Sequence, residues 1–185
     1  TETVYGLGGD ALNPSSSQKI YAAKGRPSDN PLIVHIYRFE DIYKITKEVP
    51  EEARKIADAF WPGPLTMILK RREIVPDETT AGLDTVGVRC PDHPVTRAII
   101  AAADTPVAAP SGNTSGRPSP TCARHMMEDM MGKIDGIVDG GDTWYEFDMV
   151  PGEHEIRTCG PDVTGKLCVI GSELKEHEIA ELFHV

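Results

Sequence analysis

The sequence predicts an α/β fold, with a single domain built on one twisted, mixed sheet and helices packed on it. Short apolar runs alternate along the chain with segments that carry helix start and stop signals. The 185 residues are enough for one domain with a substantial core, and 39% are hydrophobic. The 17 glycines and 15 prolines predict loops that present backbone N–H groups to a ligand.

The elements of the first half have recognisable boundaries. Asn13-Pro14-Ser15 is typical of a helix start, and Gly25 with Pro27 ends that helix. The continuous apolar run over 31–36 predicts a buried strand. The elements expected next are helices over 39–47 and 50–60, a rigid Trp61-Pro62-Gly63-Pro64 turn and a strand over 65–69.

The second half continues the alternation of strands and helices. Pro94 lies in the first turn of a predicted helix over 94–103, and Thr121 is the expected cap of a helix that ends near 131. The predicted strands are 85–89, 106–109 and 134–138. Weaker strand candidates follow at 156–157 and 167–170, and Ser172 is the expected cap of a last helix that ends near 183.

The charge is concentrated at one end of the sequence. The chain has 19 Lys+Arg and 29 Asp+Glu, a formal net charge of −10. Residues 1–120 hold 14 basic and 15 acidic side chains, whereas residues 121–185 hold 5 and 14. The negative net charge argues against a protein that mainly coats nucleic acid, which needs a surplus of cations. It leaves room for a local cationic cleft in the first two-thirds.

The sequence also indicates the cellular setting. No apolar stretch approaches 18 residues, which argues against a membrane span. The four cysteines (Cys90, Cys122, Cys159 and Cys168) form no C-x-x-C pair and are too few for a disulfide scaffold. We therefore expect reduced thiols in a cytoplasmic protein.

Two loops are candidates for anion binding. Lys24 and Arg26 stand two residues apart where a helix ends, and prolines stiffen this turn, as triphosphate or carboxylate recognition requires. The same cations could instead be solvated at a helix C-terminus. The polar 111–120 loop follows a predicted strand, a position that suits phosphate, but it lacks the Walker spacing and could be an ordinary surface loop.

Other candidate residues carry weaker signals. Gly6-Leu7-Gly8-Gly9-Asp10-Ala11 fits G-x-G-x-x-[GA], but no strand is predicted before it. Arg89 ends a predicted strand, and His35 lies on an apolar strand where a satisfied core histidine is the common explanation. No metal-ligand spacing and no nucleophile motif is present. Catalysis would then depend on positioning and charge neutralisation.

Several segments together resemble the YrdC-like family of threonylcarbamoyl-AMP synthases, in unbroken order from residue 1 to about 141. The K-x-R and S-x-N signatures of that family fall on Lys24, Arg26, Ser111 and Asn113. The remaining matches are Thr1-Glu2-Thr3-Val4-Tyr5-Gly6-Leu7, Asn30-Pro31-Leu32-Ile33-Val34-His35, Trp61-Pro62-Gly63-Pro64-Leu65-Thr66, Val88-Arg89-Cys90-Pro91 and Ala109-Pro110-Ser111-Gly112-Asn113-Thr114-Ser115-Gly116.

The resemblance implies a single YrdC-like domain over 1–185 with a concave ligand cleft. It implies conversion of L-threonine, bicarbonate and ATP (with Mg²⁺) into threonylcarbamoyl-AMP and pyrophosphate, for tRNA threonylcarbamoyladenosine. Partners would include the threonylcarbamoyl-transfer enzyme complex. Lys24 and Arg26 would be catalytic. By the same resemblance, threonine would contact Thr3, His35, Arg89 and the backbone of Ala109, and ATP would contact Lys24, Arg26, Asn30, Thr85, Ser111, Asn113, Ser119 and Arg157.

The C-terminal third departs from the family pattern. The segment after Gly140 holds no counterpart of the Ser-Thr pair that the family carries there. Either a loop near 144–146 is absent from this sequence or threonine is bound differently, and the family's first strand is expected to be missing as well. Two other function classes stay open, an RNA-binding module and a carbamoyl-transfer domain of the hydrogenase-maturation type.

Overall fold

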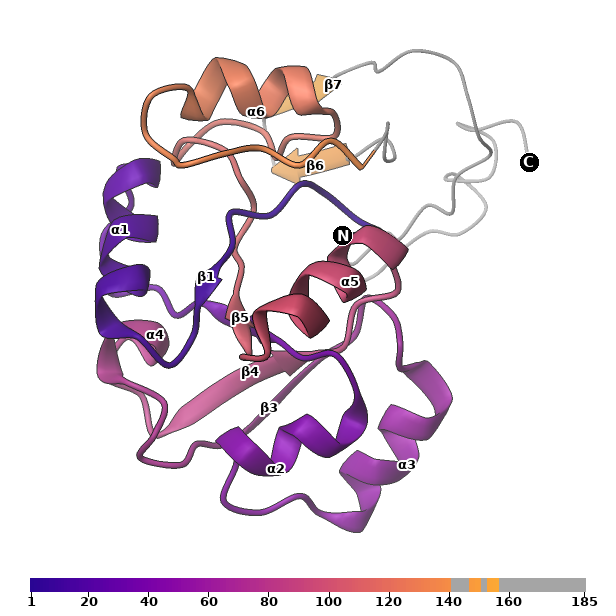
Figure 1. Ribbon diagram of the computed structural model, residues 1–185. Helices are drawn as coiled ribbons and strands as arrows, with labels where there is room; N and C mark the ends of the chain where they lie inside the picture. The colour runs from indigo at the N-terminus through magenta and orange to yellow at the C-terminus, as the bar shows by residue number, and fades with distance from the viewer. Residues whose placement is uncertain (141–146, 151–152, 157–185) are drawn as a thin grey trace, which may run out of the picture.

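The structure, a computed structural model, describes residues 1–140, 147–150 and 153–156. Its centre is a five-stranded sheet in the order β1-β5-β2-β4-β3, and β6 and β7 form a separate hairpin (Figure 1). The strands are β1 Gly9–Asp10, β2 Ile33–His35, β3 Thr66–Lys70, β4 Thr85–Arg89, β5 Val107–Ala108, β6 Phe147–Val150 and β7 Glu153–Ile156. The α/β class is confirmed.

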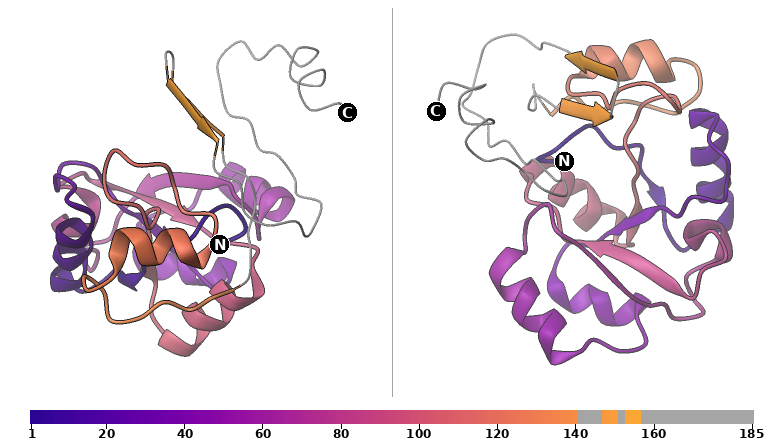
Figure 2. Two further views of the ribbon diagram at one scale, coloured as in Figure 1. Left: turned by 90° about the horizontal axis from the view of Figure 1, so that it is seen from above. Right: turned by 180° about the vertical axis from the view of Figure 1, so that it is seen from behind.

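Helices surround this sheet (Figure 2). Asn13 caps α1 as expected, since its side chain accepts the Ser15 N–H at 3.0 Å, and Gly25 ends the helix in the left-handed conformation with φ +62°. The helices are α1 Pro14–Lys24, α2 Ile42–Ile45, α3 Glu51–Phe60, α4 Asp77–Thr80, α5 Pro94–Ala103 and α6 Ala123–Met130, with a 3-10 turn over Phe39–Asp41.

The register gives the sheet two different faces. Strand β2 runs parallel to β4 and antiparallel to β5, and Val34 is opposite both Val88 and Ala108. These three side chains are fully buried and belong to the core. Side chains alternate along a strand and paired residues point to the same side, so the paired His35 and Arg89 lie on the other face. We call this second face, which carries His35, Thr85, Arg89 and Ala109, the site face.

The site face is only partly covered. Ile33 is 36% exposed and its neighbour two strands away, Ile68, is 72% exposed, with Gly87 between them in the register. The expectation of a buried strand over 31–36 was therefore wrong at Ile33, although His35 on the same face is buried. A continuous apolar run can belong to a strand whose two faces differ, because side chains alternate whatever their polarity.

Several predicted boundaries were also wrong. Residues 134–138 form no strand, because this run contains Asp135-Gly136 and pairs with no ladder partner among the described residues. The helix expected over 39–47 is shorter, since Thr46 is extended and bridges to Arg71. Cys122, not Thr121, precedes α6. Strand β1 and helix α4 were not predicted.

The remaining expectations concern segments that the structure describes only in part. Strand β7 ends at Ile156, next to the predicted 156–157 strand. Arg157, the 144–146 segment, the 167–170 strand and the last helix lie outside the described residues. Cys90 and Cys122 are free thiols. No helix in the described part of the chain is long and apolar enough to cross a membrane.

Candidate functional site

Three strands bring predicted site residues to the site face. His35 on β2 is opposite Arg89 on β4, and Ala109 follows β5, where its N–H donates to the Ile33 carbonyl at 2.9 Å. Thr85 begins β4, four residues before Arg89, so it lies about 13 Å further along the strand. The face thus holds one group around Arg89 and, at the opposite end of β4, Thr85.

Arg89 is the centre of the first group. Its guanidinium donates from Nε to the Gly63 carbonyl and from both terminal nitrogens to Thr3 Oγ1, each at 3.3 Å. It also forms an ion pair with Glu2, with Nη2 and Oε1 2.7 Å apart. The opening Thr-Glu-Thr segment and the 61–64 turn therefore fix the orientation of this nearly buried cation.

Glu2 was not predicted from the sequence as a site residue. The signal was present, because Glu2 lies inside the Thr-Glu-Thr motif, but its contact with a residue 87 positions away could not be seen. Burial acts to raise the pKa of Glu2, and the hydrogen bond and charge of Arg89 outweigh it, so the net pKa is lowered. Glu2 is consequently an anion at neutral pH.

His35 beside them is neutral at physiological pH. Its side chain is almost wholly buried and Nδ1 lies 3.3 Å from the Ile33 carbonyl oxygen. Burial, followed by the positive charge of Arg89, lowers the pKa of His35 to about 4. The imidazole can therefore act as a neutral hydrogen-bonding group beside a ligand, but not as a second cation.

The buried His35 makes stability sensitive to acid. Its pKa in the folded state is below its ordinary value of 6.5, so the unfolded chain binds a proton more readily than the folded chain between these values. We expect the free energy of unfolding to fall by about 1–3 kcal/mol as the pH drops from 6.5 to 4. Urea titrations over this range check it, and His35→Gln, which removes the titrating group, should show a shallower decrease.

Lys24 is the centre of a second group. Only 2% of it is exposed, and its ammonium donates to the Ser111 carbonyl, to the Asn113 carbonyl at 2.7 Å and, more weakly, to Asn113 Oδ1 at 3.5 Å. Burial, followed by the nearby Arg26 charge, lowers the pKa of Lys24 to about 8. The two family signatures thus meet directly, with Lys24 holding the backbone of the 111–117 loop.

Arg26 differs from Lys24 in its surroundings. It is half-buried, and Nη2 donates to the Asn30 carbonyl at 3.4 Å. The left-handed Gly25 between the two cations turns the chain, so that Lys24 points inward and Arg26 lies at the surface. Asn30 is exposed beside Arg26, and Ser111 and Ser119 are half-buried along the polar loop.

The loop is also held from its other side, by Asp129 of α6. The Asp129 carboxylate accepts the Thr114 N–H at 3.1 Å and pairs with Arg117, while the Asn113 amide donates to the Thr114 carbonyl at 3.1 Å and to Arg117 O. Asp129 is buried and was not predicted from the sequence. Asp129 is an acidic residue on an amphipathic helix, and nothing in the sequence indicates that it contacts Thr114, 15 residues earlier.

Removal of the Asp129 carboxylate should loosen the loop. We expect Asp129→Ala to lower the free energy of unfolding by about 1–3 kcal/mol, because the half-buried Thr114 N–H loses its acceptor. Arg117→Gln should cost less than about 1 kcal/mol, since the Arg117 side chain is 50% exposed. Guanidinium denaturation of both variants tests this, and equal losses would contradict it.

The two groups are joined by the opening segment. Thr3 contacts Arg89, while the Tyr5 carbonyl accepts the Gly112 N–H at 2.8 Å and Gly6 bridges to Ser111. The residues from Thr3 to Gly6 therefore extend from the Arg89 group to the loop that Lys24 holds. A ligand with a carboxylate at one end and phosphates at the other would lie along this segment.

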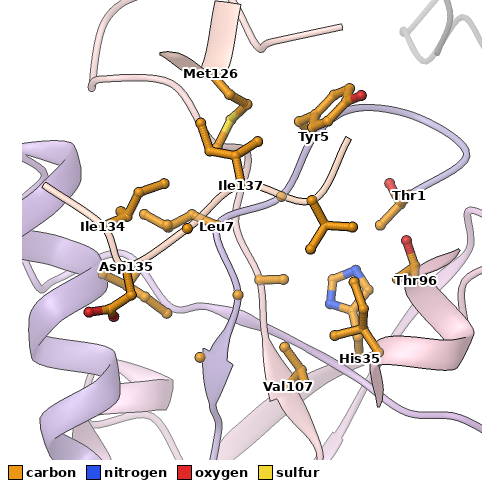
Figure 3. A pocket seen from close by; sticks show the side chains of 18 of the residues that line it. Thr1, Tyr5, Leu7, His35, Thr96, Val107, Met126, Ile134, Asp135 and Ile137 are labelled. Carbon is orange, nitrogen blue, oxygen red and sulfur yellow. The ribbon is translucent and has the colours of Figure 1, made fainter. Parts of the chain in front are cut away.

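A cavity of about 810 Å³ adjoins this segment (Figure 3). Glycines 6, 8 and 9, helices α1 and α5 and residues 133–138 and 140 contribute to its lining. His35 lies at one end of it, near Thr1 and Thr96. Of the predicted site residues, His35 and Ala109 line this cavity, whereas Arg89 and Lys24, the centres of the two groups, lie outside its lining. The contacts of those two groups, more than the cavity volume, define the candidate site.

Comparisons with known proteins identify the family of this chain. The family model Sua5_yciO_yrdC, described as "Telomere recombination", matches residues 1–148. The threonylcarbamoyl-AMP synthase of Pyrococcus abyssi is 54% identical over 143 residues, which are 77% of this chain and 42% of that protein. The threonylcarbamoyl-AMP synthase of Bacillus subtilis is 48% identical over 164 residues, 88% of this chain and 46% of that protein. The chain therefore spans less than half the length of these two curated relatives.

A solved structure is similar over most of the chain. It is the crystal structure of Pyrococcus abyssi Sua5 complexed with L-threonine, with a TM-score of 0.77 and 50% identity. The similarity covers 84% of this chain and 47% of that one.

Proposed function

This chain belongs to the Sua5/YciO/YrdC family, and on this basis we propose that it forms threonylcarbamoyl-AMP and pyrophosphate from L-threonine, bicarbonate and ATP. The product would serve threonylcarbamoyladenosine formation in tRNA. The observation that carries the proposal is that the opening segment joins two groups of site residues. At one end of this segment Thr3 contacts Arg89, which is opposite His35 in the register. At the other end the segment contacts the loop held by Lys24.

In this proposal the Arg89 group binds threonine. The guanidinium of Arg89 would pair with the substrate carboxylate, a strong charge-assisted contact. Thr3 and the neutral His35 would hold the hydroxyl and amino groups, and the backbone of Ala109 would border them. These partners come from four separate chain segments, so the site forms only in the folded chain.

ATP would occupy the side of the Lys24 group. Lys24 and Arg26 would be the catalytic cations that neutralise phosphate charge, with Lys24 exchanging a carbonyl for a phosphate oxygen as ATP binds. Ser111, Asn113 and Ser119 would orient the phosphates. The remaining nucleotide contacts in the proposal are Asn30, Thr85 and Arg157.

The chemistry requires no covalent enzyme intermediate. The threonine amine would attack the carbon of bicarbonate, and loss of water would give a carbamate. A carbamate oxygen would then attack the α-phosphate of ATP as pyrophosphate leaves. Among the described residues, no group of three His, Cys, Asp or Glu side chains could hold a metal ion. Mg²⁺ would enter with the ATP phosphates, whose oxygens it binds.

The test is pyrophosphate release by the full-length protein with ATP, labelled bicarbonate and L-threonine. We expect release that depends on threonine and a labelled product that contains both threonine and AMP. Release without threonine, or only with carbamoyl phosphate in its place, would contradict the proposal and favour a carbamoyl-transfer domain. Tight, salt-dependent RNA binding without turnover would favour an RNA-binding module.

The setting of the reaction is part of the same proposal. The product would pass to the threonylcarbamoyl-transfer enzyme complex, and direct RNA binding would be weak or absent, since residues 121–185 are strongly acidic. A cytoplasmic location remains a prediction from the cysteine content. Co-purification of the transfer enzymes with the tagged full-length protein tests the first of these points.

A further inference from the structure

We infer that the Glu2 carboxylate binds the α-ammonium group of the amino-acid substrate, so that Glu2 and Arg89 together recognise a zwitterion. The inference rests on the proposed function, because it concerns the amino acid that the function assigns to Arg89. It adds to that function a charged partner for the substrate amine, for which the sequence motifs provide none.

The first observation is the charge pair itself. Glu2 Oε1 and Arg89 Nη2 are 2.7 Å apart, and the two side chains are only 16% and 10% exposed. An anion and a cation are thus held side by side with little access to water. An α-amino acid carries its ammonium and carboxylate groups on one carbon atom, so a receptor for both must place its own charges next to each other, as this pair does.

The second observation is the unused hydrogen-bonding capacity of Glu2. The ion pair with Arg89 occupies Oε1, and the backbone N–H groups of Glu2 and Asp92 also favour the anion, but no hydrogen bond to the buried Oε2 is of good geometry within the described part of the chain. A carboxylate has about four acceptor positions, and leaving them unfilled in a buried place is costly. The Arg89 guanidinium, in contrast, already donates to Gly63 O and Thr3 Oγ1. What the pair lacks is a well-placed donor for Glu2 Oε2.

The third point concerns charge balance during binding. A ligand with only a carboxylate would meet Arg89 but would also lie beside the Glu2 anion, and like charges in such an arrangement are strongly disfavoured. A ligand that also carries an ammonium replaces this repulsion with an attraction. The pair therefore selects free amino acids over hydroxy acids that lack the amine.

The test compares two ligands on three proteins. Calorimetry of the full-length protein with L-threonine and with 3-hydroxybutanoate, which lacks the ammonium, gives the discrimination ratio. We expect wild type to prefer L-threonine by about 100-fold or more, and Glu2→Gln to lower this ratio at least about 10-fold. The affinity for 3-hydroxybutanoate should be unchanged or higher in this variant, because it removes the repulsion.

Glu52→Gln, a change of the same kind at an exposed position of α3, is the matched control and should behave as wild type. An unchanged ratio in Glu2→Gln, or an equal loss for both ligands, would overturn the inference and leave Glu2 as an orienting partner of Arg89. Wild type that binds neither ligand would overturn the proposed function and this inference with it. If Glu2→Gln does not fold, Glu2→Asp, which withdraws the carboxylate by one methylene, should show an intermediate ratio.

Discussion

Replacement of Arg89 by methionine is expected to lower both stability and threonine affinity more than any other single change in the Arg89 group. The variant leaves the Glu2 anion in a nearly buried position without its cation. Breaking a buried pair in this way costs about 3–5 kcal/mol in the free energy of unfolding. Loss of the guanidinium should also weaken L-threonine binding about 100-fold or more, because a charge-assisted contact disappears.

A double variant separates these two effects. Arg89→Met combined with Glu2→Gln removes both charges, so it should recover much of the lost stability while threonine binding stays weak. Chemical denaturation and calorimetry measure the two quantities separately. A double variant no more stable than Arg89→Met would contradict the description of Glu2 and Arg89 as a mutually compensating pair.

Replacement of Lys24 by methionine is the second large expected effect. The ammonium of Lys24 is the donor for the Ser111 and Asn113 carbonyls, and methionine supplies none. Each carbonyl left buried without a partner costs about 1–3 kcal/mol. Because the loop also carries residues assigned to ATP, we expect the rate of pyrophosphate release to fall about 10²–10³-fold.

Lys19→Met provides the control for this variant. Lys19 lies on the same helix, α1, but its side chain is exposed, so its replacement should change stability by less than about 0.5 kcal/mol and leave turnover close to wild type. Urea denaturation and the pyrophosphate assay should be run on both variants. Full activity in Lys24→Met would remove Lys24 from the catalytic groups and leave it a purely structural residue.

Local signals in the sequence were enough for most helices. The helix over 94–103 has the predicted limits, because Pro94 favours the first turn and Arg97 and four alanines are good helix formers. The cap at Asn13 and the stop at Gly25 also depend on neighbouring residues alone. Strand 134–138 failed for the opposite reason, since a strand exists only where a partner supplies its ladder hydrogen bonds.

The candidate site shows the same division. Arg89 could be singled out because it ends a predicted strand, and His35 because it is a histidine on an apolar strand, but their opposition across β2 and β4 depends on register. Glu2 and Asp129 were not predicted as site residues, because their partners are set by tertiary contacts and an isolated carboxylate is common on any surface. The family resemblance predicts which residues contact the substrates, and the fold adds the carboxylates of Glu2 and Asp129, which contact Arg89 and the polar loop.

The two-faced sheet described above also limits how relatives of this chain can diverge. Val88 points into the core and Arg89 onto the site face, one residue apart on β4. Insertion or deletion of a single residue in this strand would exchange the two sides, burying the cation and exposing the valine. Changes in length during evolution should therefore accumulate in the connecting loops, while β2 and β4 accept substitutions alone.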